Sequence, residues 1–246
     1  MINQGPLRIA MWAGPRNIST AIMYSFAQRE DTRVYDEPLY AHYLTSTDAH
    51  KYHPGSKEII SSQENDGNKV IKDIFLSTSS VPVVFFKNMC HHILNLDLSF
   101  LDTLCNIILI RDPMEMLLSF SKQIKSPSLE DTAYPDQIRM LNYLQKRGKT
   151  PPILDSKQVL LNPEKVLSTL CEKIGISFTK SMLHWKAGAR SEDGIWAKYW
   201  YSNVHQSTGF NRYVVQEIII PDYLQPLVEK CQPLYEELSE LAIQAK

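Results

Sequence analysis

The chain has 246 residues, of which 43% are hydrophobic and 22% charged. This composition is enough to bury a large core within one α/β domain, so we expect residues 1–246 to form a single domain. Its 26 lysines and arginines balance 27 aspartates and glutamates, for a formal net charge of -1. Such a balance creates no strong basic field and argues against a nucleic-acid partner.

Apolar runs alternate with amphipathic segments along the chain. Strands are predicted near residues 7–13, 33–36, 82–87, 104–110 and 152–155. Helices are predicted at residues 19–29, 66–76, 113–124, 135–147, 163–174 and 222–244. This alternation predicts right-handed crossovers, and hence an α/β fold of three layers with a mostly parallel central sheet flanked by helices. Ligands of such sheets bind beyond the carboxyl ends of the strands.

The first strand leads through a Gly-Pro turn into a helix that two hydroxyl residues open. The free amides and the partial positive charge of a helix N-terminus favour an anion in such a turn, and Arg16 adds a guanidinium suited to phosphate or sulfate. We therefore predict a P-loop fold whose phosphate-binding loop comprises Gly14, Pro15, Arg16, Asn17, Ile18, Ser19 and Thr20. Thr20 stands where a Walker A motif has its lysine, so the loop is not that of a nucleoside triphosphatase.

A second strand-to-helix junction carries another anion-binding pattern. An apolar strand ending at Ile110 runs into Arg111, Asp112 and Pro113, and Ser119 follows eight residues after the arginine. Asp112 is a good N-cap and Pro113 a good first helical residue. Both junctions begin at carboxyl ends of strands, which allows them to share one crevice.

Together the two motifs resemble those of sulfotransferases that use 3′-phosphoadenosine 5′-phosphosulfate (PAPS). The pattern Pro15, Arg16, Ser19, Thr20 is similar to their 5′-phosphosulfate loop, and Arg111 with Ser119 is similar to their 3′-phosphate motif. The resemblance continues through residues 159–178, which support the fold and carry no chemistry. It implies an enzyme that transfers a sulfuryl group from PAPS to a small-molecule acceptor, with Arg16 supplying positive charge and no metal required.

Two places offer a catalytic base. Glu37 follows the second predicted strand and resembles a glutamate that some bacterial sulfotransferases use. Lys87 ends the next strand and matches the lysine of the Lys-x-His motif of cytosolic sulfotransferases, which assists the leaving group. The histidine position of that motif holds Met89, which leaves His91 or His92 as the alternative base. An imidazole of ordinary pKa would suit proton abstraction near neutral pH.

The tail lacks the segments with which cytosolic sulfotransferases close over the donor. Residues 46–66 and 185–212 are polar stretches too long for plain connections, and we interpret them as lids or acceptor-binding loops. Arg212 is predicted to complete the 3′-phosphate site, with Arg190 and Lys198 as alternatives.

Four scattered cysteines indicate buried thiols rather than a disulfide framework. Neither a leader sequence nor an apolar run of about 18 residues is present, so we expect a cytoplasmic protein without a membrane partner. The acceptor and the oligomeric state are not determined by the sequence. Two other functions stay open: a P-loop kinase-like phosphotransferase and a non-catalytic nucleotide-binding module.

Overall fold

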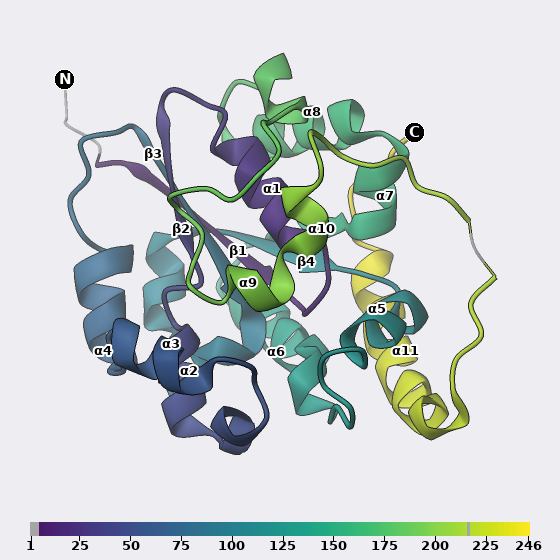
Figure 1. The fold of residues 1–246 in the computed structure, drawn as a ribbon. Coiled ribbons are helices and arrows are strands. Elements are labelled where there is room, and N and C mark those ends of the chain that lie inside the picture. The colour runs from purple at the N-terminus through teal and green to yellow at the C-terminus, as the bar shows by residue number, and fades with distance from the viewer. Residues whose placement is uncertain (1–4, 216) are drawn as a thin grey trace.

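The residues described by a computed structural model, 5–215 and 217–246, contain a five-stranded parallel sheet of order β2-β3-β1-β4-β5 (Figure 1). The strands are β1 (Leu7–Ala13), β2 (Thr32–Asp36), β3 (Val83–Met89), β4 (Cys105–Ile110) and β5 (Ile153–Asp155). All five predicted strands are present, with bounds that differ by at most two residues. β1 is the central strand, paired with β3 on one side and β4 on the other, and five of its seven residues are buried.

The helices lie on both faces of this sheet. They are α1 (Ser19–Phe26), α2 (Tyr40–Ser46), α3 (Ser56–Ser62), α4 (Gly67–Val70), α5 (Pro113–Phe120), α6 (Tyr134–Gln145), α7 (Ser156–Leu161), α8 (Pro163–Ile174), α9 (Ala197–Trp200), α10 (Ser202–His205) and α11 (Gln225–Ser239). Successive side chains of a strand point to opposite faces. On β1, Ala10 and Trp12 accordingly join the core under α5, α6 and α11, whereas Ile9 and Met11 join the core under α1 and α8. The predicted three-layer α/β fold is confirmed.

Several helices are shorter in the structure than the sequence predicts, and others were not predicted. α1 ends at Phe26, α4 continues only as a π-helical turn over Ile71–Phe75, and α11 starts after a 3-10 turn at Asp222–Leu224. Residues 46–66, expected as a polar loop, contain α3. In the part of the chain that the structure describes, no helix is both long and apolar enough to cross a membrane.

The segment that follows α8 returns across the sheet. Figure 1 shows α9 and α10 in front of the sheet, near the N-terminal end of α1, while α2 and α3 lie to one side of them. A bridge from His184 to Gly209 closes the base of this excursion, and Trp185 N donates a hydrogen bond to Thr208 O at 3.0 Å. Residues 185–212 are therefore an ordered cover over the carboxyl ends of the strands.

Candidate active site

A cavity of about 380 Å³ lies beneath residues 200–211, at the carboxyl ends of the strands. The predicted site residues that line it are Pro15, Arg16, Asn17, Ile18, Ser19, Thr20, Glu37, Lys87, His91, His92, Arg111 and Ser119. Gly14 and Arg212 are not among the lining residues. The structure thus brings twelve sequence-predicted residues from four segments of the chain to one cavity.

The loop before α1 is held in a conformation that leaves amides free for a ligand. Arg16 and Ile18 both have positive φ angles, 58° and 56°, which residues other than glycine rarely adopt. Ile18 is the N-cap residue of α1 and provides no side-chain bond to the first amides of the helix. Asn17 ties the loop to β4, because its Nδ2 donates to Leu109 O at 3.0 Å. These features match an anion cradle.

Gly14 serves this loop through its small size. A Cβ atom at this position would lie 3.0 Å from both Asn17 Nδ2 and Thr132 O. Any side chain here would therefore displace Asn17 or the neighbouring backbone. Gly14 shapes the loop from outside the cavity.

The two arginines connect the two phosphate motifs. Arg16 Nε donates to Ser119 Oγ at 3.0 Å, and Arg111 Nη1 donates to Arg16 O at 2.7 Å. Arg111 also pairs with Glu115, Nε to Oε2 at 3.0 Å. Burial, and then the charge of Arg111, lower the pKa of Arg16 from its usual value. Two guanidinium groups thus lie together in one partly buried place, which favours binding of an anion.

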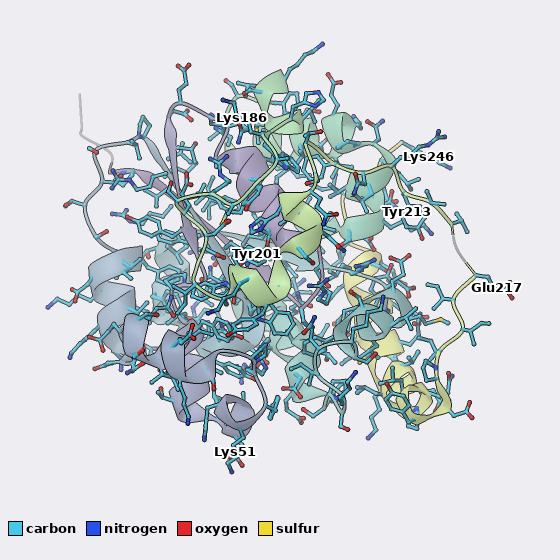
Figure 2. The ribbon with its side chains drawn as sticks, viewed as in Figure 1. Lys51, Lys186, Tyr201, Tyr213, Glu217 and Lys246 are labelled. Atoms are coloured by element: carbon cyan, nitrogen blue, oxygen red, sulfur yellow. The ribbon has the colours of Figure 1, made fainter. Side chains whose placement is uncertain are left out.

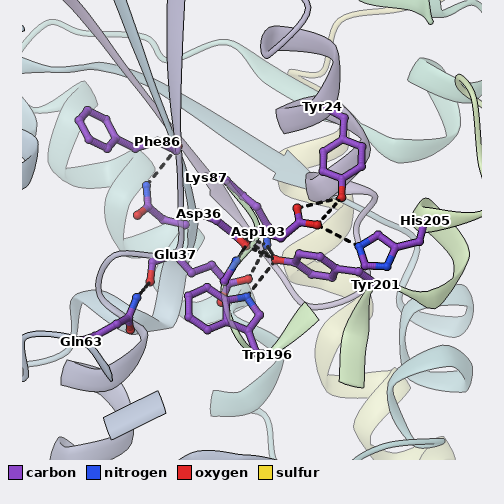
Figure 3. Close-up of polar contacts among 12 residues, drawn as sticks. Tyr24, Asp36, Glu37, Gln63, Phe86, Lys87, Asp193, Trp196, Tyr201 and His205 are labelled. Carbon is purple, nitrogen blue, oxygen red and sulfur yellow. Dashed lines mark hydrogen bonds and ion pairs between the residues drawn. The ribbon is translucent and has the colours of Figure 1, made fainter. Parts of the chain in front are cut away.

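Lys87 is at the centre of a buried polar network (Figure 3). Its ammonium is 1% exposed and donates to Asp36 Oδ1 at 2.9 Å, to Glu37 Oε1 at 2.5 Å and to the hydroxyl of Tyr201. An ammonium has three N–H donors, so all three are engaged here. The register of β2 on β3, which places Asp36 beside Lys87, positions these groups.

Tyr201 joins this network from a distant part of the chain. Its hydroxyl donates to Asp36, with oxygen distances of 2.9 and 2.8 Å, and accepts from Trp196 Nε1 at 3.0 Å. Gly194 N donates to the other side of Asp36, at 3.0 Å from Oδ2. Figure 2 shows Tyr201 at the centre of the viewed face, at the junction of α9 and α10. The residues that cover the cavity are therefore anchored on the strand-end carboxylate Asp36.

The network perturbs the acid–base properties of its members. Burial raises the pKa of Glu37, the Lys87 charge opposes that rise, and the neighbouring Asp36 adds to it. Burial alone would lower the pKa of Lys87, but the two carboxylates outweigh burial and raise it. Glu37 also has a positive φ of 41° and donates its amide to Lys87 O at 2.8 Å. A lysine that stays charged thus holds a glutamate whose proton affinity is increased.

His91 and His92 lie on a 3-10 turn, Cys90–Ile93, that follows β3, and both line the cavity. Burial is the main cause that lowers the pKa of His91 to about 3 and that of His92 well below its usual value. The expected imidazole of ordinary pKa is therefore not what the structure shows. Both rings are neutral at pH 7.

None of the three residues considered for the 3′-phosphate site, Arg190, Lys198 and Arg212, lines the cavity. Arg190 Nη2 lies 3.3 Å from Glu192 Oε1, and Lys198 Nζ lies 2.6 Å from Glu58 Oε2. Arg212 is exposed. Its neighbour Tyr213 donates instead to Glu115, the partner of Arg111, at 2.7 Å from Oε1. The binding role predicted for Arg212 stays a prediction.

The cavity wall also contains residues to which sequence reasoning assigned no individual role, among them Tyr40, His53, Trp200 and Tyr201. Trp200 O accepts from Arg16 Nη1 at 3.0 Å, which joins α9 to the phosphate loop. The aromatic-rich run 196–201 was the available signal for Trp200 and Tyr201. It did not distinguish them from aromatic residues that serve only as packing.

The sequence profile of a family described as the sulfotransferase domain matches residues 7–239. The chain belongs to the sulfotransferase family. The sulfotransferase domain of the Synechococcus PCC 7002 olefin synthase superposes with a TM-score of 0.54 at 15% identity, covering 94% of this chain and 97% of that domain. A sulfotransferase from Alicyclobacillus acidocaldarius gives 0.56 at 10% identity, covering 97% and 96%. At these identities the superpositions show the sulfotransferase fold alone.

Two curated proteins of Arabidopsis thaliana are more similar to this sulfotransferase-family chain in sequence. Branched-chain-amino-acid aminotransferase-like protein 2 is 38% identical over 92% of the chain, and protein 1 is 37% identical over 94%. The chain spans only 40% and 41% of the length of these relatives. The matched part of each relative is thus less than half of that protein.

Proposed function

We propose that this chain is a sulfotransferase that moves a sulfuryl group from PAPS to a hydroxyl or amine of a small-molecule acceptor. The observation that carries the proposal is the meeting of Arg16 and Arg111 in one cavity, next to Ser119 and the amides of the loop before α1. PAPS carries a phosphosulfate and a 3′-phosphate, and the two motifs provide one arginine for each of these anions.

In the proposed reaction the acceptor oxygen or nitrogen attacks sulfur. A new bond to sulfur forms, the sulfur–oxygen bond to the 5′-phosphate breaks, and 3′,5′-adenosine bisphosphate leaves. Arg16, Ser19 and Thr20 would stabilise the charge on the transferring group and on the 5′-phosphate, by the same electrostatic logic as in phosphoryl transfer. Arg111 and Ser119 would hold the 3′-phosphate.

Glu37 is the base that we propose for the acceptor proton. Its raised pKa makes the carboxylate a stronger base than an ordinary glutamate, whereas neutral imidazoles of very low pKa accept a proton poorly. All three N–H donors of Lys87 are engaged, so we propose that Lys87 orients Glu37. Lys87 could assist the leaving group only by giving up one of these three hydrogen bonds.

Calorimetric titration tests the donor assignment. We expect 3′,5′-adenosine bisphosphate to bind at least about 100-fold more tightly than AMP, since a second charged phosphate gains charge-assisted hydrogen bonds. Equal affinities would overturn the proposal. Turnover of radiolabelled PAPS by Glu37→Gln, His91→Asn and His92→Asn, over a panel of acceptors, then tests the base, and three variants with normal rates would reject both candidates.

A further inference from the structure

Part of the cavity wall consists of aromatic and imidazole rings. His91 and His92 of the turn after β3 meet His53, Tyr40 at the start of α2, and Trp200 at the end of α9. We call these five residues the imidazole chamber. Phe120 lies next to the Trp200 ring, with ring centroids 6.3 Å apart, and Met89 and Phe210 add apolar wall elsewhere in the cavity.

Two tyrosines of α2 stack on the His92 ring. Tyr40 stacks on it at 4.9 Å with an interplanar angle of 17°, and Tyr43 stacks at 4.7 Å with 21°. Tyr43 also meets the His91 ring edge to face at 4.7 Å. The two imidazoles also contact each other, with ring centroids 4.7 Å apart and an interplanar angle of 83°. Packing therefore fixes the orientation of both rings.

The chamber contains unmatched polar groups. Among the described residues, Nδ1 of His91 and Nδ1 of His92 are buried without a hydrogen-bond partner, and the two residues are only 7% and 1% exposed. Nε2 of His53 and Nε1 of Trp200 are buried without a partner as well. Only His53 Nδ1 is paired, with the Tyr40 hydroxyl at 2.8 Å. Buried polar groups are normally paired in proteins, so such a concentration points to a ligand that pairs them.

The chemistry of the imidazole chamber disfavours a charged ligand. Burial lowers the pKa of His53 to about 4 and that of His91 to about 3, so both are neutral at pH 7. The ammonium of Lys87 is already shared by three partners. A neutral imidazole offers one donor and one acceptor, as a hydroxyl does, whereas a carboxylate only accepts and an ammonium only donates. A charged group would also lose its hydration, and none of the five chamber residues provides a charge to replace it.

We propose that the imidazole chamber binds the acceptor, and that this acceptor is an uncharged alcohol with an apolar body and at least one further hydroxyl group that pairs with the edges of His91 and His92. This inference rests on the proposed function and deepens it, since it narrows the acceptor to one chemical class. The histidines are then binding residues for the acceptor, and Glu37 takes the proton.

Four phenols that differ only in one substituent test the charge and hydrogen-bond selectivity. They are 4-(2-hydroxyethyl)phenol, 4-ethylphenol, 4-hydroxyphenylacetate and tyramine, titrated by calorimetry into wild-type protein saturated with 3′,5′-adenosine bisphosphate. We expect the hydroxyethyl compound to bind at least about 10-fold more tightly than the other three, the effect of about one net hydrogen bond. Tighter binding of a charged member, equal affinities, or no binding of the hydroxyethyl compound would each overturn the inference.

His92→Phe and His91→Phe separate pairing from packing. Phenylalanine keeps the ring stack with Tyr40 and Tyr43 but removes both nitrogens, so each variant should lose the preference for the hydroxyethyl compound over 4-ethylphenol. His184→Phe is the matched control, because His184 is exposed and outside the cavity. A variant that keeps the wild-type preference would refute the assignment, and the wild-type titrations decide it even where a variant does not fold.

The bisphosphate titration separates the two proposals. Failure of the bisphosphate to bind would refute the donor assignment and the proposed function. Normal bisphosphate affinity without the expected selectivity among the phenols would refute the chamber alone.

Discussion

Tyr201→Phe removes one oxygen atom from the centre of the buried network. The tyrosine is 4% exposed, and its hydroxyl donates to Asp36 and accepts from Trp196 and Lys87. The ring, which lies 4.7 Å from Lys87 Nζ in a cation–π contact, is retained in the variant. The substitution therefore tests the hydroxyl and little else.

The expected loss of stability follows from these contacts. A hydrogen bond to a charged group contributes about 1.5–3 kcal/mol, and a buried donor left without its partner, here Trp196 Nε1, costs about 1–3 kcal/mol. Allowing for partial relaxation, we expect the free energy of unfolding to fall by about 3 kcal/mol. For a chain of this size that corresponds to a melting temperature lower by about 6–12 °C.

Urea unfolding and thermal melts of the variant measure this change. Tyr235→Phe is a matched control, because its hydroxyl also donates to a carboxylate, Asp155 Oδ2 at 2.7 Å, but from a half-buried position outside the cavity. We expect the control to lose about 1.5 kcal/mol, since water can replace part of its bond. If Tyr201→Phe costs no more than Tyr235→Phe, the network does not anchor the cover over the cavity, and the reasoning is refuted.

Three further predictions concern the proposed reaction and its titratable groups. Glu37→Gln should lower turnover by about 100-fold or more and abolish the acid limb of the pH–rate profile. In the wild type we expect this limb at a pH above the usual glutamate pKa, because burial raises the pKa of Glu37. An unchanged profile would exclude Glu37 as the base. Arg111→Lys should reduce the preference for 3′,5′-adenosine bisphosphate over AMP, measured by calorimetry, by about 10-fold or more, because lysine lacks the guanidinium fork. An equal loss of affinity for AMP would contradict a role specific to the 3′-phosphate. His91 has a pKa of about 3 in the folded protein and about 6.5 in the unfolded chain. As the pH falls below about 6.5 only the unfolded chain takes up a proton, so the free energy of unfolding falls by about 2 kcal/mol by pH 5. In urea titrations at pH 7.5 and pH 5, His91→Phe should therefore lose about 2 kcal/mol less than wild type, and identical losses would show that His91 titrates normally.

The motif-bearing parts of the fold were predictable because their signals are local. Each phosphate motif occupies a strand, a turn and the start of a helix that are adjacent in sequence, and α5 has the N-cap that its sequence predicts: Asp112 accepts from Met114 N and Glu115 N. α8 matches its predicted bounds for the same reason, since Asn162 caps its start and Gly175 ends it with a φ of 75°.

Helices α2 and α7 were not predicted because they lack an amphipathic pattern of sufficient length. The first five residues of α2 are all buried, and their apolar members pack with Ile59 of α3 and with Trp196 and Tyr201, so polar and apolar positions do not alternate along the helix. α7 has six residues and begins directly at the end of β5. Tertiary packing rather than local preference stabilises such short helices.

The sequence by itself determined the layered fold, the two strand-to-helix turns that carry Arg16 and Arg111, and their place at strand ends, because backbone preferences and capping act over a few neighbouring residues. Only the tertiary structure decided which groups complete the site. Tyr201 reaches Asp36 across 165 positions of the chain, and Arg16 reaches Ser119 across 103. Burial that follows from this packing also raised the pKa of Glu37 and lowered those of His91 and His92, because the free energy of a charge depends on everything that surrounds it.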